Sequence, residues 1–137
     1  MILLHAAATW FLVGLIWTIQ LVHYPLFAQV GERSFRAYHD EHGRRITWIV
    51  GPVMGVELVT GALLVFQPPS GAPPWALWTG LVLLLVIWGS TGALQVPLHA
   101  RLGERFSREA VRALVGTNWL RTFAWTARGV LVLYLVY

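Results

Sequence analysis

The chain has 137 residues, of which 57% are hydrophobic and 12% charged, and its net charge of +4 comes from ten arginines and no lysine. A soluble domain usually has about a quarter of its residues charged, so this composition argues against a soluble fold and favours an integral membrane protein. A nucleic-acid-binding domain is excluded, because the arginines are confined to short segments between apolar runs. The absence of cysteine excludes disulfides, thiolate metal sites and cysteine nucleophiles.

Four segments are long and apolar enough to be transmembrane helices, which need about 20 largely apolar residues. They cover residues 2–28, 46–66, 75–98 and 113–137. We expect the helices themselves to cover residues 2–28, 33–66, 75–99 and 107–137. The segment before residue 46 has an amphipathic helical pattern, and Ser107 with Glu109 provides an N-cap and an acidic first turn. The sequence thus predicts one all-α domain, residues 1–137, folded as an up-down bundle of four transmembrane helices.

The connecting segments differ in charge. Residues 31–45 and 101–112 each contain four arginines, whereas the connection 67–74 is uncharged and rich in proline. If all four helices span the bilayer, both arginine-rich segments lie on one side, which the positive-inside rule places in the cytoplasm. We therefore expect both termini on the non-cytoplasmic side. The expected location is the bacterial inner membrane, with membrane lipid around the bundle.

Polar side chains concentrate in the half of the expected bundle near the arginine-rich connections. Ordered by depth at about 1.5 Å per residue, they are His42 and His99 at the mouth, then His23, Gln95 and Asn118, then Gln20, Thr91 and Arg121, and Glu57 near the midplane. Spacings of three or four residues place the polar side chains of each helix on one face. We expect these faces to converge on a polar pocket open to the cytoplasm.

The outer half offers only two comparable side chains. For His5 we expect a packing role or a place at the lipid interface, and for Arg128 an outward orientation or a bond to a carbonyl. His39, within the arginine-rich segment, is expected to be a solvated neighbour of Asp40.

Glu57 and Arg121 have two interpretations. They form either a structural ion pair between the second and fourth helices or a catalytic pair. In the catalytic interpretation Glu57 accepts a proton or binds a metal, and Arg121 tunes it or binds an anionic group of the substrate.

The histidines also have two interpretations. His23, His42 and His99 form a transition-metal or haem site, since neutral imidazole is the commonest protein metal ligand. Alternatively His23 forms a hydrogen bond with Gln95 or Asn118, while His42 and His99 are solvated at the interface.

Four further side chains are candidates for orienting a substrate: Gln20, Gln95, Asn118 and Trp119. Most of the eight tryptophans are explained by interfacial belts and packing. A ligand-stacking role is open for Trp17, Trp88 and Trp119.

Two strings in the second half of the chain resemble known membrane proteins. They are Gln95-Val96-Pro97-Leu98-His99 and Asn118-Trp119-Leu120-Arg121-Thr122. Together they resemble a small, uncharacterised family of four-helix bacterial membrane proteins. They are also similar to the group that includes anthrone oxygenases, which have an Asn/His-containing segment after the third helix and an Arg-Thr pair in the fourth.

The first half resembles, in layout, the four-helix haem-binding protoporphyrinogen oxidases. The shared features are Leu4-His5, Trp10-Phe11, Gly14-Leu15 and Arg45-Ile46 leading to Pro52. In that family the histidine of the first helix is a haem ligand, which would fall on His5, although its spacing to the tryptophan differs here. Both resemblances imply a redox protein acting on a hydrophobic substrate, aromatic ones included.

We therefore expect an oxidoreductase that uses a metal or haem cofactor on a lipophilic small molecule in the cytoplasm-facing pocket. The alternative is a non-catalytic protein: a lipid- or pigment-binding protein, a transporter or an accessory membrane subunit. Helix-borne glycines such as Gly51 and Gly89 could let helices of two copies approach closely, so a homo-oligomer is a further candidate assembly.

Overall fold

The computed structural model describes residues 1–137 and contains only helices and short connections. The first long helix comprises α1 (Ile2–Thr18), the π-helical turn η1 (Ile19–His23), α2 (Tyr24–Leu26) and the 3-10 turn η2 (Phe27–Gln29). The second is α3 (Glu32–Phe66); the third comprises α4 (Pro74–Ser90), the π-helical turn η3 (Thr91–Gln95) and α5 (Val96–Glu104); the fourth is α6 (Arg108–Val136). The predicted all-helical fold with four long helices is confirmed. The third helix continues to Glu104 instead of ending at residue 99.

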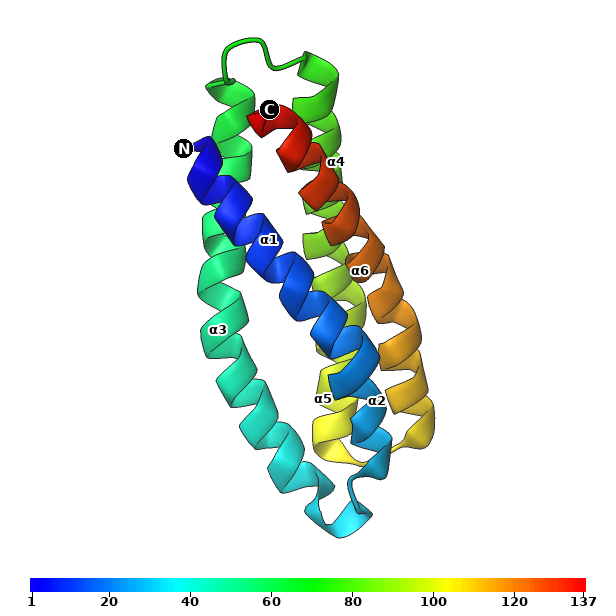
Figure 1. Cartoon of the computed structure of the whole chain (residues 1–137). Helices are drawn as coiled ribbons and strands as arrows, with labels where there is room; N and C mark the ends of the chain where they lie inside the picture. The colour runs from blue at the N-terminus through cyan, green and yellow to red at the C-terminus, as the bar shows by residue number, and fades with distance from the viewer.

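The four long helices lie side by side, and successive helices run in opposite directions (Figure 1). Both termini and the proline-rich connection between α3 and α4 lie at one end of the bundle. The two arginine-rich connections lie at the other end, which we call the arginine-rich end.

Two helices contain a π-helical turn immediately before a proline. The turn η1 ends two residues before Pro25, and η3 ends two residues before Pro97. Proline has no N–H, and its ring collides with the carbonyl one turn earlier, which accounts for the widened turns at these two points. By contrast, Pro52 lies inside α3, which continues through it. Such π-helical turns are frequent at functional sites, and these two carry polar side chains of the predicted pocket: Gln20, His23, Thr91 and Gln95.

The helix ends follow from local sequence. The Ser107 hydroxyl accepts a hydrogen bond of 3.2 Å from the N–H of Ala110, which confirms the predicted N-cap of α6. Pro74 begins α4, where its missing N–H has no intrahelical role. Gly71 turns the chain between α3 and α4 with a φ of 79°, a conformation that glycine adopts without steric cost.

Two apolar clusters hold the bundle together. The first lies along the middle of the helices and consists of Leu12, Val13, Ile16, Met54, Ile87, Ala124 and Trp125. The second lies towards the arginine-rich end and consists of Ile19, Tyr24, Phe27, Phe35, Leu102, Val111 and Leu114. Residues from all four long helices contribute to these clusters, so each helix is fixed relative to the others on both levels.

Three of the long helices are long and apolar enough to cross a membrane: Ile2–Gln29, Glu32–Phe66 and Pro74–Glu104. The fourth, α6, is not among them, since Arg121 and Arg128 interrupt its apolar sequence. Both arginines are buried inside the bundle. From residue 120 onwards the exposed surface of α6 is apolar and includes Leu120, Phe123 and Val130.

Candidate functional site

A cavity of about 430 Å³ lies between α3 and the third long helix. Its walls are Ile19, Tyr24, His39, Gly43, Ile46, Thr47, Val50, Gly51, Met54, Trp88, Thr91, Gln95, Val96, His99 and Arg121. We call it the α3–α5 pocket. Its volume is within the range of about 300–1,000 Å³ that is usual for small-molecule sites. At its rim, Thr47 and Gly51 of α3 and Val96 of α5 are exposed, so the pocket opens sideways between these helices.

The pocket is lined by residues with polar atoms that have no hydrogen-bond partner within the protein. Three buried side-chain atoms in the whole chain lack a hydrogen bond: Nδ1 of His39, Oε1 of Gln95 and Nε of Arg121. All three belong to residues that line the α3–α5 pocket. These residues are each at least 94% buried. Buried polar groups are nearly always paired, so three groups without a hydrogen bond around one cavity make it the candidate site.

Arg121 is the only buried cation of the pocket, and all of its protein contacts are to neutral groups. Its Nη1 donates a hydrogen bond of 3.3 Å to Oδ1 of Asn118. Its guanidinium carbon lies 5.0 Å from the centroid of the Trp125 ring, a cation–π contact. No aspartate or glutamate lines the pocket. The positive charge of Arg121 is therefore not neutralised by the protein.

A chain of hydrogen bonds runs along the pocket at the arginine-rich end. The hydroxyl of Tyr24 lies 2.9 Å from Nε2 of His99, and Nδ1 of His99 lies 3.0 Å from Nε2 of His39. When the phenol donates to His99, His99 in turn donates to His39, and the unpaired Nδ1 of His39 carries a proton. This Nδ1 lies 3.8 Å from Oδ1 of Asp40, the neighbouring exposed carboxylate.

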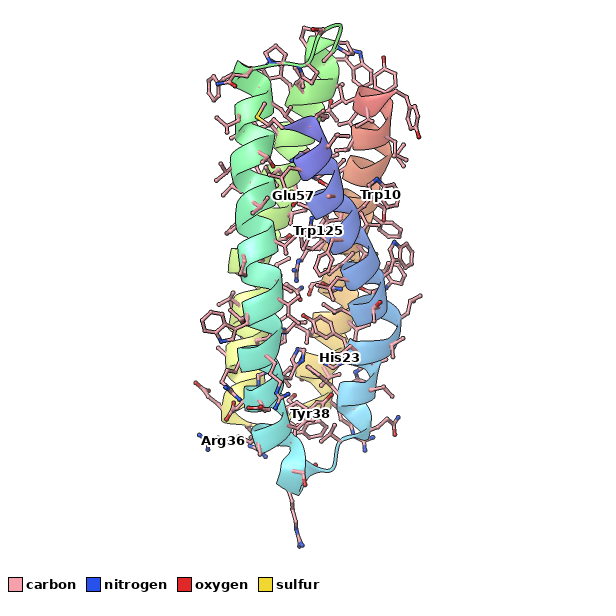
Figure 2. All side chains as sticks on the ribbon, turned by 60° about the vertical axis from the view of Figure 1, so that its left-hand side comes forward. Trp10, His23, Arg36, Tyr38, Glu57 and Trp125 are labelled. Carbon is pink, nitrogen blue, oxygen red and sulfur yellow. The ribbon has the colours of Figure 1, made fainter.

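The other two histidines of this end form a separate pair. Nε2 of His23 lies 2.8 Å from Nδ1 of His42, and both residues line a different groove, beside Tyr38 and Glu41. Figure 2 shows His23 and Tyr38 near the end of the bundle that carries Arg36. The ring centroids of His42 and His99 are 6.4 Å apart, so the pair borders the pocket without lining it.

Behind the pocket, an amide network joins the first and fourth helices. Nδ2 of Asn118 donates to Oε1 of Gln20 at 2.8 Å, and Nε2 of Gln20 donates to the carbonyl of Val115 at 3.1 Å. The hydroxyl of Thr122 also donates to Oε1 of Gln20. Gln20 and Asn118 are thus fully engaged in the protein. Gln20 fixes the orientation of Asn118, which in turn accepts a hydrogen bond from Arg121.

No known protein family, curated protein or solved structure matches this chain. The resemblances in the sequence therefore remain predictions, and the function has to be inferred from the geometry of the site.

The structure brings several of the predicted site residues together and separates others. His99, Gln95 and Arg121 line one pocket, and Gln20 and Asn118 lie directly behind it. Trp119 does not take part, since its ring packs against Trp17 and Phe123.

The predicted histidine set is divided. His99 lies in the α3–α5 pocket, whereas His23 and His42 bond each other in the neighbouring groove. His23 is thus bonded to His42 and not to Gln95 or Asn118. No group of three or more His, Asp or Glu side chains is arranged to hold a metal ion.

The predicted pair of Glu57 and Arg121 is wrong. Oε1 of Glu57 accepts from Nε of Arg128 at 3.0 Å. The indole N–H of Trp125 donates to Oε2 of Glu57, and Thr9 donates to Oε1. About two turns of α6 separate the two arginines, which lie on nearly the same helix face, so the choice between them depends on the relative depth of the helices, which the sequence does not specify.

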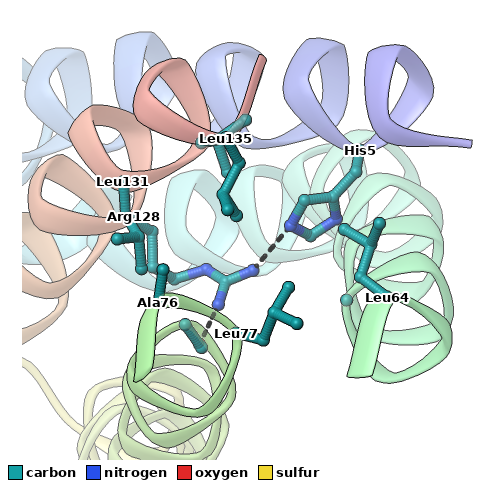
Figure 3. Close-up of a pocket in the computed structure, with 10 residues that line it drawn as sticks. His5, Leu64, Ala76, Leu77, Arg128, Leu131 and Leu135 are labelled. Carbon is teal, nitrogen blue, oxygen red and sulfur yellow. Dashed lines mark hydrogen bonds between the residues drawn. The ribbon is translucent and has the colours of Figure 1, made fainter. Parts of the chain in front are cut away.

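For His5 the packing role is confirmed, and the place at the lipid interface is wrong. His5 is buried: its Nδ1 lies 2.8 Å from Oγ1 of Thr60, and its Nε2 lies 3.1 Å from Nη2 of Arg128. Arg128 also donates to the carbonyl of Gly80, so the predicted bond to a carbonyl is confirmed and the outward orientation is wrong. His5, Gly80 and Arg128 border a cavity of about 20 Å³, the size of one water site. Figure 3 shows His5 and Arg128 at this cavity.

The half of the bundle nearer the termini thus has a polar cluster of its own, formed by His5, Thr9, Glu57, Thr60, Trp125 and Arg128. Figure 2 shows Glu57 and Trp125 in that half. We call it the outer cluster. Its charges are balanced and its groups are bonded to one another, which is the pattern of a structural network.

Two residues of the pocket were missed as site residues in the sequence. Tyr24 lies on the same helix as Gln20, four positions later, and this spacing could have identified it. His39 is buried and not solvated as expected. Its spacing of three residues from His42 was the available signal.

Proposed function

We propose that this chain is an integral membrane protein that binds a lipophilic small molecule in the α3–α5 pocket. The observation that carries the proposal is the coincidence of the three unpaired buried polar atoms with a single cavity. The rest of the wall is largely apolar and includes Ile46, Val50 and Met54. A mostly apolar cavity with a few convergent polar groups is the usual form of a small-molecule site.

The proposal places all four long helices across the bilayer. Three meet the requirement by length and composition. The 29 residues of α6 are about 43 Å long at 1.5 Å per residue. Its two deep arginines point into the bundle, and intramembrane charges almost always face the bundle interior.

The positive-inside rule then places the arginine-rich end in the cytoplasm. The expected membrane is the bacterial inner membrane. In this orientation the pocket lies in the cytoplasmic half, and its exposed rim residues, such as Thr47 and Val96, face lipid. A lipophilic molecule can therefore enter from the bilayer.

Accessibility from each side tests the orientation. The chain has no cysteine, so Ser34→Cys and Ser70→Cys each introduce a single thiol at an exposed position on opposite ends of the bundle. In intact cells, a membrane-impermeant maleimide should label Ser70→Cys and leave Ser34→Cys unlabelled. Ser34→Cys should be labelled once the membrane has been permeabilised. The reverse pattern would overturn the proposed orientation.

Thiol protection tests the binding proposal. Thr47→Cys places a thiol on the rim of the pocket, and Ala100→Cys places one at an exposed position outside it. In phosphatidylcholine nanodiscs, the rate of modification by N-ethylmaleimide is measured with decanoate and with methyl decanoate. At least one of the two should slow modification of Thr47→Cys and leave Ala100→Cys unchanged. If neither compound slows modification of Thr47→Cys, and phosphatidylglycerol in the nanodisc does not slow it either, the proposal is overturned.

The oxidoreductase prediction, with its metal or haem cofactor, stays a prediction. Of the predicted ligands, only His99 lines the pocket, and it is already bonded to Tyr24 and His39. A metal count and an absorption spectrum of the same detergent-purified sample test this part. A stoichiometric metal or a Soret band would support it, whereas the absence of both signals would overturn it.

A further inference from the structure

Two arginines of α6 differ in a way that identifies the missing partner of the pocket. Arg121 and Arg128 are seven positions apart, close to two turns, and both are buried. Arg128 has the carboxylate of Glu57 at 3.0 Å. Arg121 has no carboxylate and faces the α3–α5 pocket instead.

An unpaired charge is costly in a buried, low-dielectric site, whereas a paired one is tolerated. The amide of Asn118 at 3.3 Å and the face of Trp125 at 5.0 Å are neutral groups, so they stabilise the guanidinium without neutralising it. The cost is removed when an anion occupies the pocket. Arginine suits this role because its planar fork binds carboxylate and phosphate in two parallel hydrogen bonds.

We propose that the ligand of the α3–α5 pocket is an anionic amphiphile, whose carboxylate or phosphate head group pairs with Arg121. This inference rests on the proposed function and names the class of molecule that the pocket takes. Nε of Arg121, which has no hydrogen-bond partner in the protein, supplies a donor to this head group. The unpaired Oε1 of Gln95 accepts from a hydroxyl or N–H of the ligand.

The apolar part of the ligand has its own place in the pocket. Ile46, Val50 and Met54 are spaced four residues apart on α3 and form one apolar stripe. Val96 and Trp88 face the pocket from the third helix. An alkyl chain or apolar ring system lies along this stripe and leaves through the exposed rim towards lipid.

The head group can belong to a membrane phospholipid or to a separate small molecule. Both sources offer the same chemistry to Arg121. The comparison of decanoate with methyl decanoate isolates the charge, because the two share the same chain length. Nanodiscs of phosphatidylcholine, with and without phosphatidylglycerol, isolate the contribution of an anionic lipid.

The experiment measures protection of Thr47→Cys against N-ethylmaleimide. Decanoate should slow the reaction at concentrations at least about tenfold lower than methyl decanoate, since hydrogen bonds to charged groups contribute this much to affinity. If phosphatidylglycerol alone gives the same protection, the inference holds with the lipid as the source. This comparison needs no change at Arg121.

Variants of Thr47→Cys then show whether the preference for decanoate over methyl decanoate depends on Arg121. Arg121→Gln should abolish the preference for decanoate, whereas Arg121→Lys should retain part of it. Arg112→Gln, an exposed arginine on the same helix, should leave the preference intact. A preference that survives Arg121→Gln would overturn the inference.

The failures of the two proposals are distinguishable. Equal protection by the acid and the ester would overturn the anionic head group and leave the lipophilic pocket in place. No protection by either compound or by the anionic lipid would overturn both.

Discussion

The carboxylate of Glu57 lies 3.0 Å from Nε of Arg128. Arg128 is on α6, which also carries Arg121, an arginine without a carboxylate partner. Glu57 is fully buried, with an exposed fraction of 0%. Its two oxygens accept from Arg128, Thr9 and Trp125, so one side chain of α3 connects α1 and α6. The outer cluster therefore fixes the half of the bundle away from the pocket.

Glu57→Gln should strongly destabilise the protein. The variant leaves Arg128 buried without a counter-ion, and breaking a buried pair in this way costs about 3–5 kcal/mol. The free energy of unfolding in mixed micelles measures the loss. Because removing both charges avoids the uncompensated cation, the double variant Glu57→Gln/Arg128→Met should be more stable than Glu57→Gln alone. A double variant that is no better would contradict the charge-pair explanation.

Gly61→Ala should also destabilise the outer cluster. A Cβ at this position would lie 3.1 Å from Cε1 of His5 and 3.1 Å from Cδ2 of Leu84, which is too close in a packed interior. Gly89→Ala is the matched control, because a Cβ there meets nothing within 4 Å. Replacing glycine by alanine inside a helix otherwise stabilises by about 0.5–1 kcal/mol. Thermal unfolding should therefore shift down for Gly61→Ala and not for Gly89→Ala; the same upward shift in both would refute the close packing.

Gln20 and Asn118 should be energetically coupled. Gln20→Leu leaves Nδ2 of Asn118 buried without its acceptor, and an unsatisfied buried group costs about 1–3 kcal/mol. Asn118→Leu should be costly as well, because it removes a contact of Arg121. The double variant should cost less than the sum of the single variants. Additive losses in unfolding experiments would show that the two amides act independently.

Pro97→Ala should change the pocket while the bundle stays folded. Alanine restores the N–H that proline lacks, so the π-helical turn η3 can return to α-helix. That change rotates Thr91 and Gln95 relative to the rest of the pocket. Circular dichroism should show the helical content unchanged, and the protection of Thr47→Cys by decanoate should fall. Undiminished protection would mean that the π-helical turn does not shape the pocket.

The sequence was sufficient for the helices and for the general place of the pocket. Apolar blocks and prolines define the four helices, and Ser107 caps α6 as its sequence indicates. Spacings of three and four residues placed Gln20, Gln95, Asn118 and Arg121 in one region of the bundle. These are local or one-dimensional properties, which periodicity and depth describe well.

The side-chain contacts between different helices could not be predicted from the sequence in the same way. Arg121 and Arg128 lie about two turns apart on nearly the same face of α6, so the axial position of α6 relative to α3 decides which one Glu57 meets. His5 looked isolated because its partners, Thr60 and Arg128, are 55 and 123 positions away. His23 and His42 lie on the first and second long helices and contact each other directly. This contact depends on the orientation that the widened turn η1 gives to His23.

The most direct test of the central claim is photocrosslinking of the purified protein in nanodiscs with a diazirine-bearing fatty acid, followed by mass spectrometry of the peptides. If the α3–α5 pocket binds an anionic amphiphile, the crosslinks gather on residues 43–54 and 88–99, which contain most of its wall, and excess decanoate removes them. Crosslinks spread evenly over exposed apolar positions such as Trp78, Val82 and Leu85, and insensitive to decanoate, would contradict it.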